Sequence, residues 1–171
     1  MEKIIKSHNS KILNNRLEKS EKATKPCNCK NGINSCPIGG KCQTSAIVYK
    51  ATITANDGEV KTYTGGTDRT FKLRHYGHVA DAKDSKNRNN TKLAGYIWDK
   101  KDEGVEIKEI KWEIIKKCHK YAPGQGKCDV CLSEKLAIMK NSETNSLNKR
   151  NELMNKCLHM RRWKLAGVKY K

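Results

Sequence analysis

The sequence has few of the side chains from which large apolar cores are built. Its 171 residues include one Phe, three Trp and six Tyr, and hydrophobic residues make up 36% of the chain. A chain of this length supports one compact domain with an appendage, and this composition gives that domain a thin core. Part of the chain is therefore expected to be held together by something other than apolar burial.

Long apolar stretches are also missing. No run approaches the roughly 20 residues that cross a bilayer. The segment Met1–His8 lacks the apolar centre of a signal peptide. We therefore expect a soluble, intracellular chain with no membrane partner. In a reducing compartment, cysteines persist as metal ligands or buried thiols more often than as disulfides.

Acidic residues are scarce relative to basic ones. Eighteen Asp and Glu stand against 36 Lys and Arg, which gives a formal charge of +18. A polycation of this size attracts nucleic acid, because binding releases condensed counterions. Nucleic acid is the expected partner, and a merely solvated lysine-rich surface is the alternative. Charge alone does not separate DNA from RNA.

The folded domain is expected to begin at residue 46, after a basic flexible lead-in at 1–26 and a cysteine-rich segment at 27–45. Strands are predicted at 47–53 and 60–64, and Asn56-Asp57-Gly58 between them is a hairpin signal. A three-residue loop would place Tyr49 and Tyr63 on one face of the sheet, whereas a two-residue loop would place them on opposite faces.

The rest of the domain alternates between helical and strand patterns. A helix is expected from about Asp68, with Arg74 and His78 on one face. The other expected elements are a helix at 91–101, a strand over 105–114 with a bulge near 108–109, and helices at 132–140 and 147–157. This order predicts an α/β protein of the α+β type, with a small three-stranded antiparallel sheet flanked by helices. Residues 161–171 form a basic tail.

The carboxy-terminal cysteines have a spacing typical of a zinc site. Cys128 and Cys131 open a predicted helix, and Cys157 and His159 follow after 25 intervening residues. Two thiolates separated by two residues fit adjacent corners of a tetrahedron. A structural zinc ion is the preferred interpretation, and free thiols with a chance histidine are the alternative.

A second cluster supplies four thiols within a Gly- and Asn-rich stretch that cannot form a core from its own side chains. Its members are Cys27, Cys29, Cys36 and Cys42. A second structural zinc ion is the economical interpretation, with two disulfides as the alternative. Cys118 and His119 remain, and we expect them to be structural or solvent-facing because both sets of four are complete.

Five side chains are of the types that phosphodiester hydrolysis needs. The reaction uses a carboxylate to hold Mg²⁺, a guanidinium to neutralise phosphate, and a hydroxyl or imidazole to guide water. Singly, a strand tyrosine usually packs in the core, and a helical glutamate usually faces solvent. The five residues are Tyr49, Tyr63, Arg74, His78 and Glu134.

The sequence resembles GIY-YIG endonucleases. Ile47-Val48-Tyr49 stands where the first tripeptide of that family belongs, and Tyr63-Thr64-Gly65 stands where the second belongs. Ile47 replaces a glycine and Thr64 an isoleucine, at positions that serve packing. The further matching residues are Arg74, His78, Glu134 and Leu147-Asn148.

The resemblance extends to the GIY-YIG domain of Penelope-like retroelement polyproteins and covers about residues 27–165. It is carried by Cys27-Asn28-Cys29-Lys30, Ser35-Cys36-Pro37, Gly40-Lys41-Cys42, Cys128-x2-Cys131-Leu132-x-Glu134-Lys135, residues 147–153 and Lys156-Cys157-x-His159. It implies a GIY-YIG nuclease domain over 46–160 that contains the second zinc site. The implied location is the nucleus. The implied partners are DNA, the reverse transcriptase portion of the same polyprotein, and the element RNA.

The resemblance also implies a role for each site residue. Glu134 would bind one Mg²⁺ or Mn²⁺ ion, and Arg74 would contact the scissile phosphate. Tyr49 and Tyr63 would position and deprotonate the water, with the base assigned to neither. His78 would assist at the leaving group or phosphate, and Asn148 would buttress the site or contact the backbone.

The reaction implied is a DNA nick whose 3′-hydroxyl primes reverse transcription at the target. Two alternatives stand beside it. One is a catalytically inactive, zinc-stapled nucleic-acid-binding module, and the other is a secreted, disulfide-rich basic protein.

Overall fold

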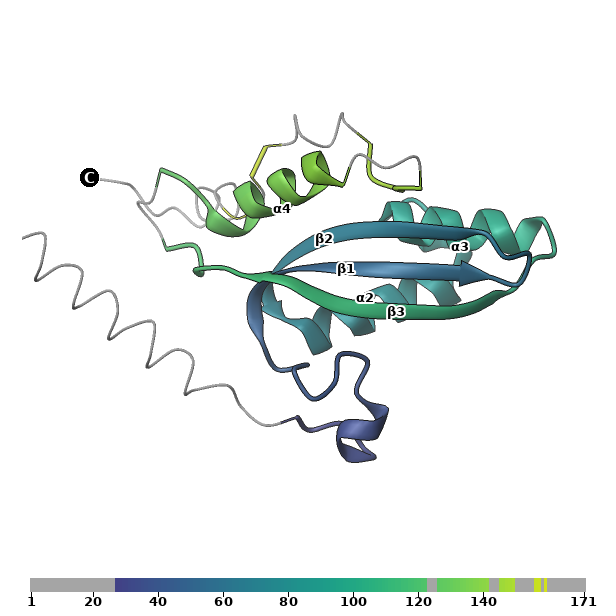
Figure 1. Cartoon of the computed structure of the whole chain (residues 1–171), viewed down its shortest axis with the longest axis horizontal. Helices are drawn as coiled ribbons and strands as arrows, with labels where there is room; N and C mark the ends of the chain where they lie inside the picture. Colours follow the sequence, from purple (N-terminus) through teal and green to yellow (C-terminus); the bar gives the residue numbers. More distant parts are fainter. Residues whose placement is uncertain (1–26, 123–125, 142–144, 150–155, 158, 160–171) are drawn as a thin grey trace, which may run out of the picture.

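The computed structural model describes residues 27–122, 126–141, 145–149, 156, 157 and 159 (Figure 1). The predictions for residues 1–26 and 161–171 lie outside this part. No helix in the described part is long and apolar enough to span a membrane. The elements are η1 (Gly32–Ser35), β1 (Ser45–Ala55), β2 (Val60–Thr70), α2 (Phe71–Lys83), η2 (Ser85–Asn87), α3 (Lys92–Asp102), β3 (Ile107–Lys117) and α4 (Asp129–Lys140).

The three strands form one antiparallel sheet in the order β2-β1-β3. Alternate residues of β1 face opposite sides. Tyr49 packs in a core cluster with Phe71 of α2 and Leu93 of α3. Val48 packs in a second cluster with Val130 of α4, on the other face. The predicted three-stranded antiparallel sheet flanked by helices is confirmed.

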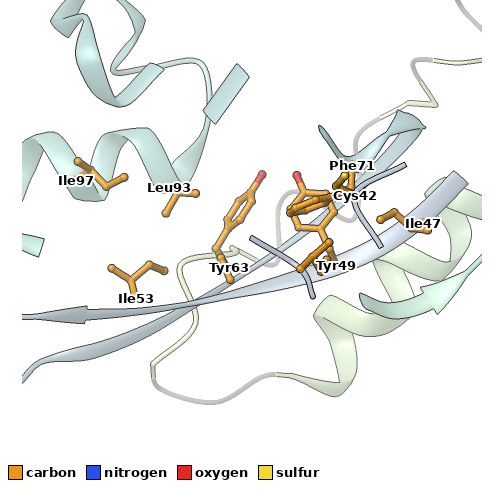
Figure 2. Packing of buried hydrophobic residues seen from close by; sticks show 10 residues of the cluster. Cys42, Ile47, Tyr49, Ile53, Tyr63, Phe71, Leu93 and Ile97 are labelled. Carbon is orange, nitrogen blue, oxygen red and sulfur yellow. The ribbon is translucent and has the colours of Figure 1, made fainter. Parts of the chain in front are cut away.

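The hairpin between β1 and β2 has the three-residue loop. The Ala55 N–H donates to the Glu59 carbonyl over 3.0 Å, and Thr54 lies opposite Val60. Gly58 has a φ of +85°, in the left-handed region that this loop requires. Tyr49 and Tyr63 consequently stand on one face of the sheet, with both hydroxyls pointing away from the strands (Figure 2).

The third strand contains the predicted bulge. Thr54 lies opposite Glu109 and Ala55 lies opposite Ile107, so Lys108 is the extra residue. A second irregularity at Ile115 separates the Val48–Lys116 and Tyr49–Ile114 pairs. Between the two bulges, Ile110, Trp112 and Ile114 pack against the cluster that contains the tyrosines.

The predicted start of the first long helix at Asp68 is wrong. β2 continues through Gly65 and Gly66 to Thr70, and α2 begins at Phe71. The predicted strand at 60–64 stops short of the two glycines. Instead, Gly65 pairs with Tyr49 and Gly66 pairs with Val48, because the missing side chains leave room for neighbours on both faces.

Two predictions near the carboxy terminus also need correction. α4 begins at Asp129, three residues before the expected Leu132, with Cys128 as its N-cap residue. No helix begins at Leu147. Ser146 forms a bridge to Thr62, and residues 147–149 are irregular because they follow the edge of β2. The remainder of that predicted helix lies largely outside the described residues.

The cysteine-rich segment packs on the same core as the strands. Cys42 is fully buried beside Ile47 and Tyr49, and Ile38 belongs to the same cluster. The Phe71 and Lys72 N–H groups donate to the carbonyls of Thr44 and Cys42, which joins the segment to the start of α2. Residues 38–44 therefore position α2 on the sheet.

Two glycine substitutions test the backbone of this fold. Gly58→Ala should destabilise the protein by about 1 kcal/mol, because a side chain disfavours a positive φ even in open space. Gly77→Ala, inside α2 and also with open space around it, should stabilise by up to about 1 kcal/mol. Urea unfolding of both variants measures the difference. Equal effects of the two substitutions would contradict the assigned loop.

Candidate active site and metal centres

The Tyr49 hydroxyl lies at the centre of a polar cluster beneath α2. The Arg74 Nε–H donates to it over 2.9 Å, and His78 Nε2 lies 2.8 Å from it. Arg74 and His78 are one helical turn apart, so α2 presents both to the same hydroxyl, as their spacing predicts. Tyr49 is fully buried and forms the back of the site.

The histidine in this cluster is neutral. Burial, together with the positive charge of Arg74, lowers the pKa of His78 to about 3. Its Nδ1 is buried without a hydrogen-bond partner in the described part of the chain. Trp112 of β3 packs against the ring at a centroid distance of 5.3 Å. His78 therefore interacts with a phenol and an indole and does not line the cavity described below.

Tyr63 and Arg74 open onto a cavity of about 730 Å³. Glu134 of α4 lines the same cavity. The structure therefore brings three of the predicted catalytic residues to one cavity, with Tyr49 and His78 directly behind Arg74. Further basic side chains line the same cavity, namely Arg69, Arg88, Lys92, Lys135 and Lys156.

Glu134 approaches β2 at its glycine pair. Its Oε1 accepts a 2.7 Å hydrogen bond from the Gly66 N–H. A methyl group at Gly66 would lie 3.1 Å from Glu134 Oε2, and one at Gly65 would lie 2.6 Å from the Tyr49 hydroxyl. The two glycines thus admit the carboxylate and the phenol to adjacent backbone positions. A carboxylate at a cavity that keeps room for water suits Mg²⁺, which retains several waters in protein sites.

Neither phenol is acidic in this environment. Burial raises the pKa of Tyr49 above its ordinary value, although the adjacent Arg74 opposes the shift. Burial also raises the pKa of Tyr63, and the proximity of Tyr49 adds to the increase. Both phenols are therefore protonated at neutral pH, and deprotonating either requires positive charge beyond that of Arg74.

Asn148 lies at the edge of β2. Its Oδ1 accepts from the Thr64 N–H over 2.7 Å, and its Nδ2 donates to the Thr64 carbonyl over 2.9 Å. The side-chain amide thus pairs with Thr64 as a neighbouring strand would. It holds the backbone between Tyr63 and Gly65 and does not line the cavity.

The amino-terminal thiols have the spacing of zinc ligands. Cys42 Sγ lies 3.6 Å from Cys27 Sγ and 3.8 Å from Cys29 Sγ. Two thiolates on one tetrahedral zinc are roughly 3.8 Å apart, whereas bonded sulfurs are about 2 Å apart. None of the eight cysteines, all of which lie in the described part of the chain, forms a disulfide. Cys27, Cys29, Cys36 and Cys42 could hold one zinc ion.

The carboxy-terminal set has the same compactness. His159 Nδ1 lies 3.3 Å from Cys128 Sγ and 3.2 Å from Cys131 Sγ, and Cys131 Sγ lies 3.5 Å from Cys157 Sγ. These four residues could hold a second zinc ion, with their ligand atoms all within 4.8 Å of one another. Cys118 is buried and belongs to neither set. His119 is exposed and contacts Asp129.

Two residues of the site carried no functional signal in the sequence. Trp112 joins Tyr49, Phe71, His75 and His78 in one aromatic cluster. In the sequence, Trp112 is only one of the alternating apolar residues that predict the strand over 105–114. Asp68, expected to open a helix, instead lines the cavity from β2 and contacts His159.

Comparison of the chain with protein-family models, curated proteins and solved structures finds no match.

The two metal centres predict two zinc ions per chain, measurable by native mass spectrometry. Cys131→Ser should remove one zinc and destabilise the domain by several kcal/mol, because ligand binding and folding share one free energy. Cys118→Ala is the matched control, since that cysteine is buried but lies outside both sets. It should retain both ions. A fully folded, metal-free wild-type chain would refute the assignment.

Proposed function

We propose that the protein is a metal-dependent endonuclease or nickase that hydrolyses a DNA phosphodiester in the cavity between β2, α2 and α4. The observation that carries the proposal is the convergence of Tyr63, Arg74 and Glu134 on one cavity. These are the phenol, guanidinium and carboxylate that the resemblance to GIY-YIG endonucleases implies. They come from three elements separated along the chain, and ordinary core packing gives no reason for all three to line the same space.

The electrostatics of the cavity suit a phosphate substrate. Lys135 and Lys156 line it together with Arg69 and Lys92, so an anionic backbone enters a basic environment. Arg74 has its Nε–H on Tyr49, which fixes the guanidinium plane. In the proposal, its remaining N–H groups meet the scissile phosphate, where charge develops in the transition state.

Glu134 is the proposed ligand of the divalent cation. One carboxylate with water completing the coordination is a common arrangement for Mg²⁺, and Mn²⁺ fits the same oxygen donors. The bound cation would supply charge stabilisation at the phosphate. The hydrogen bond from Gly66 to Oε1 fixes the direction of the carboxylate.

The two tyrosines take different roles in the proposal. Both are buried, but Tyr63 lines the cavity and would meet the attacking water there, whereas Tyr49 does not line the cavity and holds Arg74. At neutral pH, only a small fraction of a phenol with a raised pKa is deprotonated and able to act as a general base. Its deprotonated fraction grows tenfold with each pH unit below the pKa, so the rate should rise with pH.

The biological setting follows the resemblance. Hydrolysis that leaves a 3′-hydroxyl would provide a primer for reverse transcription at the nicked target. The proposed partners are then target DNA, the reverse transcriptase portion of a retroelement polyprotein and the element RNA, and the proposed location is the nucleus.

A second candidate is a zinc-stapled nucleic-acid-binding module without activity. The basic lining of the cavity favours it, since phosphate contacts require no cleavage. Salt-sensitive DNA binding that persists without cleavage under Mg²⁺ and Mn²⁺ would select this candidate over the nuclease.

The carboxylate is tested by Glu134→Gln in a supercoiled-plasmid nicking assay with Mg²⁺. The amide oxygen still accepts from Gly66, but the charge that binds the cation is gone, so nicking should fall by roughly 100-fold or more. Glu109→Gln, at an exposed position of β3, is the control and should nick normally. Wild-type activity in Glu134→Gln would rule out the assigned site.

The phenols are tested by the pH dependence of nicking in Tyr63→Phe and Tyr49→Phe. Wild-type rate should rise about tenfold per unit between about pH 6 and 9, because the phenol pKa values are raised. Tyr63→Phe should lower the nicking rate by roughly 10²- to 10⁴-fold and abolish its increase with pH. Tyr49→Phe should lose rate but keep the slope. The reverse pattern would assign the base to Tyr49.

A further inference from the structure

The carboxy-terminal metal centre shares a wall with the cavity. Cys131, Cys157 and His159 belong to the candidate zinc site, and all three also line the cavity. A zinc ion there would therefore lie next to the proposed substrate. The metal centre can therefore influence the geometry of the cavity as well as stabilise the fold.

His159 connects this centre to β2. Its Nδ1 faces the sulfurs of Cys128 and Cys131, and its Nε2 lies 3.5 Å from Asp68 Oδ1. The imidazole is largely shielded, with 14% of its side chain exposed. One nitrogen on the metal and the other toward a carboxylate is the arrangement that fixes tautomer and orientation in zinc sites.

Asp68 and Glu134 join the same two elements. Asp68 lies two residues after Gly66, whose N–H binds Glu134. On α4, Glu134 follows Cys131 by three residues, so the two lie on neighbouring positions of one helical face. β2 therefore reaches α4 directly at Glu134, and it reaches the metal centre at the start of α4 through His159.

We propose that Asp68 is a positioning residue that orients His159 for zinc and thereby fixes the α4 wall of the cavity against β2. The zinc part of this proposal is independent of catalysis. The consequence for Glu134 rests on the proposed nuclease function.

Asp129, the acidic residue next to Cys128, does not fill this role. It accepts from the His119 N–H over 2.8 Å and from the Ser133 hydroxyl over 3.1 Å. It also contacts Lys116. These contacts hold Asp129 at the end of β3 and the first turn of α4. The carboxylate that contacts the imidazole is that of Asp68, 3.5 Å from His159 Nε2.

The zinc arm of the test uses Asp68→Asn in the full chain. Zinc is titrated out with a chromogenic chelator, and released thiols are alkylated and mapped by peptide mass spectrometry. The affinity of the carboxy-terminal centre should fall 10- to 100-fold, exposing Cys131 and Cys157 first, while Cys36 and Cys42 stay protected. Asp99→Asn, at an exposed position of α3, is the control and should match wild type. Unchanged zinc affinity in Asp68→Asn would overturn the proposal.

The cavity arm measures plasmid nicking by Asp68→Asn at limiting and at saturating zinc. Activity should be lost at limiting zinc and restored at saturating zinc, because the wall reforms once the metal is bound. Low activity at saturating zinc would instead place Asp68 among the groups that act on the substrate, and it would refute the positioning role. If the wild-type chain does not nick, the proposed function fails, and the zinc titration still decides the Asp68–His159 interaction.

Discussion

The register of the β1–β2 hairpin is the constraint on which the rest of the site depends. Because side chains alternate along a strand, one residue more or fewer in the loop would move Tyr63 to the face opposite Tyr49. The loop of 56–58, with Gly58 at a positive φ, sets the pairing that places Gly65 opposite Tyr49. The same pairing places Gly66 where Glu134 can accept its N–H. A turn far from the cavity thus determines which groups face it.

The close approach of α4 to β2 at Gly66 compensates for the thin apolar core. Only one Phe is present, and it packs edge-on against Tyr49 and Trp112. α4 reaches the sheet through Val130, Cys128 and the polar contact of Glu134 rather than through a broad apolar face. A bound metal ion at each cysteine set would supply the stability that apolar burial lacks, since ligand binding contributes directly to folding. The metal centres would therefore stabilise the same fold that brings the proposed catalytic residues together.

Local patterns predicted most of the framework and part of the site. Alternation predicted the three strands and the bulge near Lys108, and cysteine spacing predicted both candidate ligand sets. The hairpin signal predicted a turn at 56–58 but left two loop lengths open. The continuation of β2 through Gly65 and Gly66 was missed, because glycine usually weakens a strand and only close neighbours explain it here. For a related reason, the sequence placed Asp68 at the start of a helix and predicted no specific contact for Asn148. Their partners lie 91 and 84 residues away in sequence, and no local pattern encodes such contacts.

The most direct test of the account is a crystal structure of the chain with a short DNA duplex and Mn²⁺, using anomalous scattering to locate the metal. The account predicts an Mn²⁺ ion bonded to the Glu134 carboxylate, with a backbone phosphate between it and the Arg74 guanidinium and the Tyr63 hydroxyl facing that phosphate. Mn²⁺ bound away from Glu134, or DNA lying outside the cavity, would contradict it.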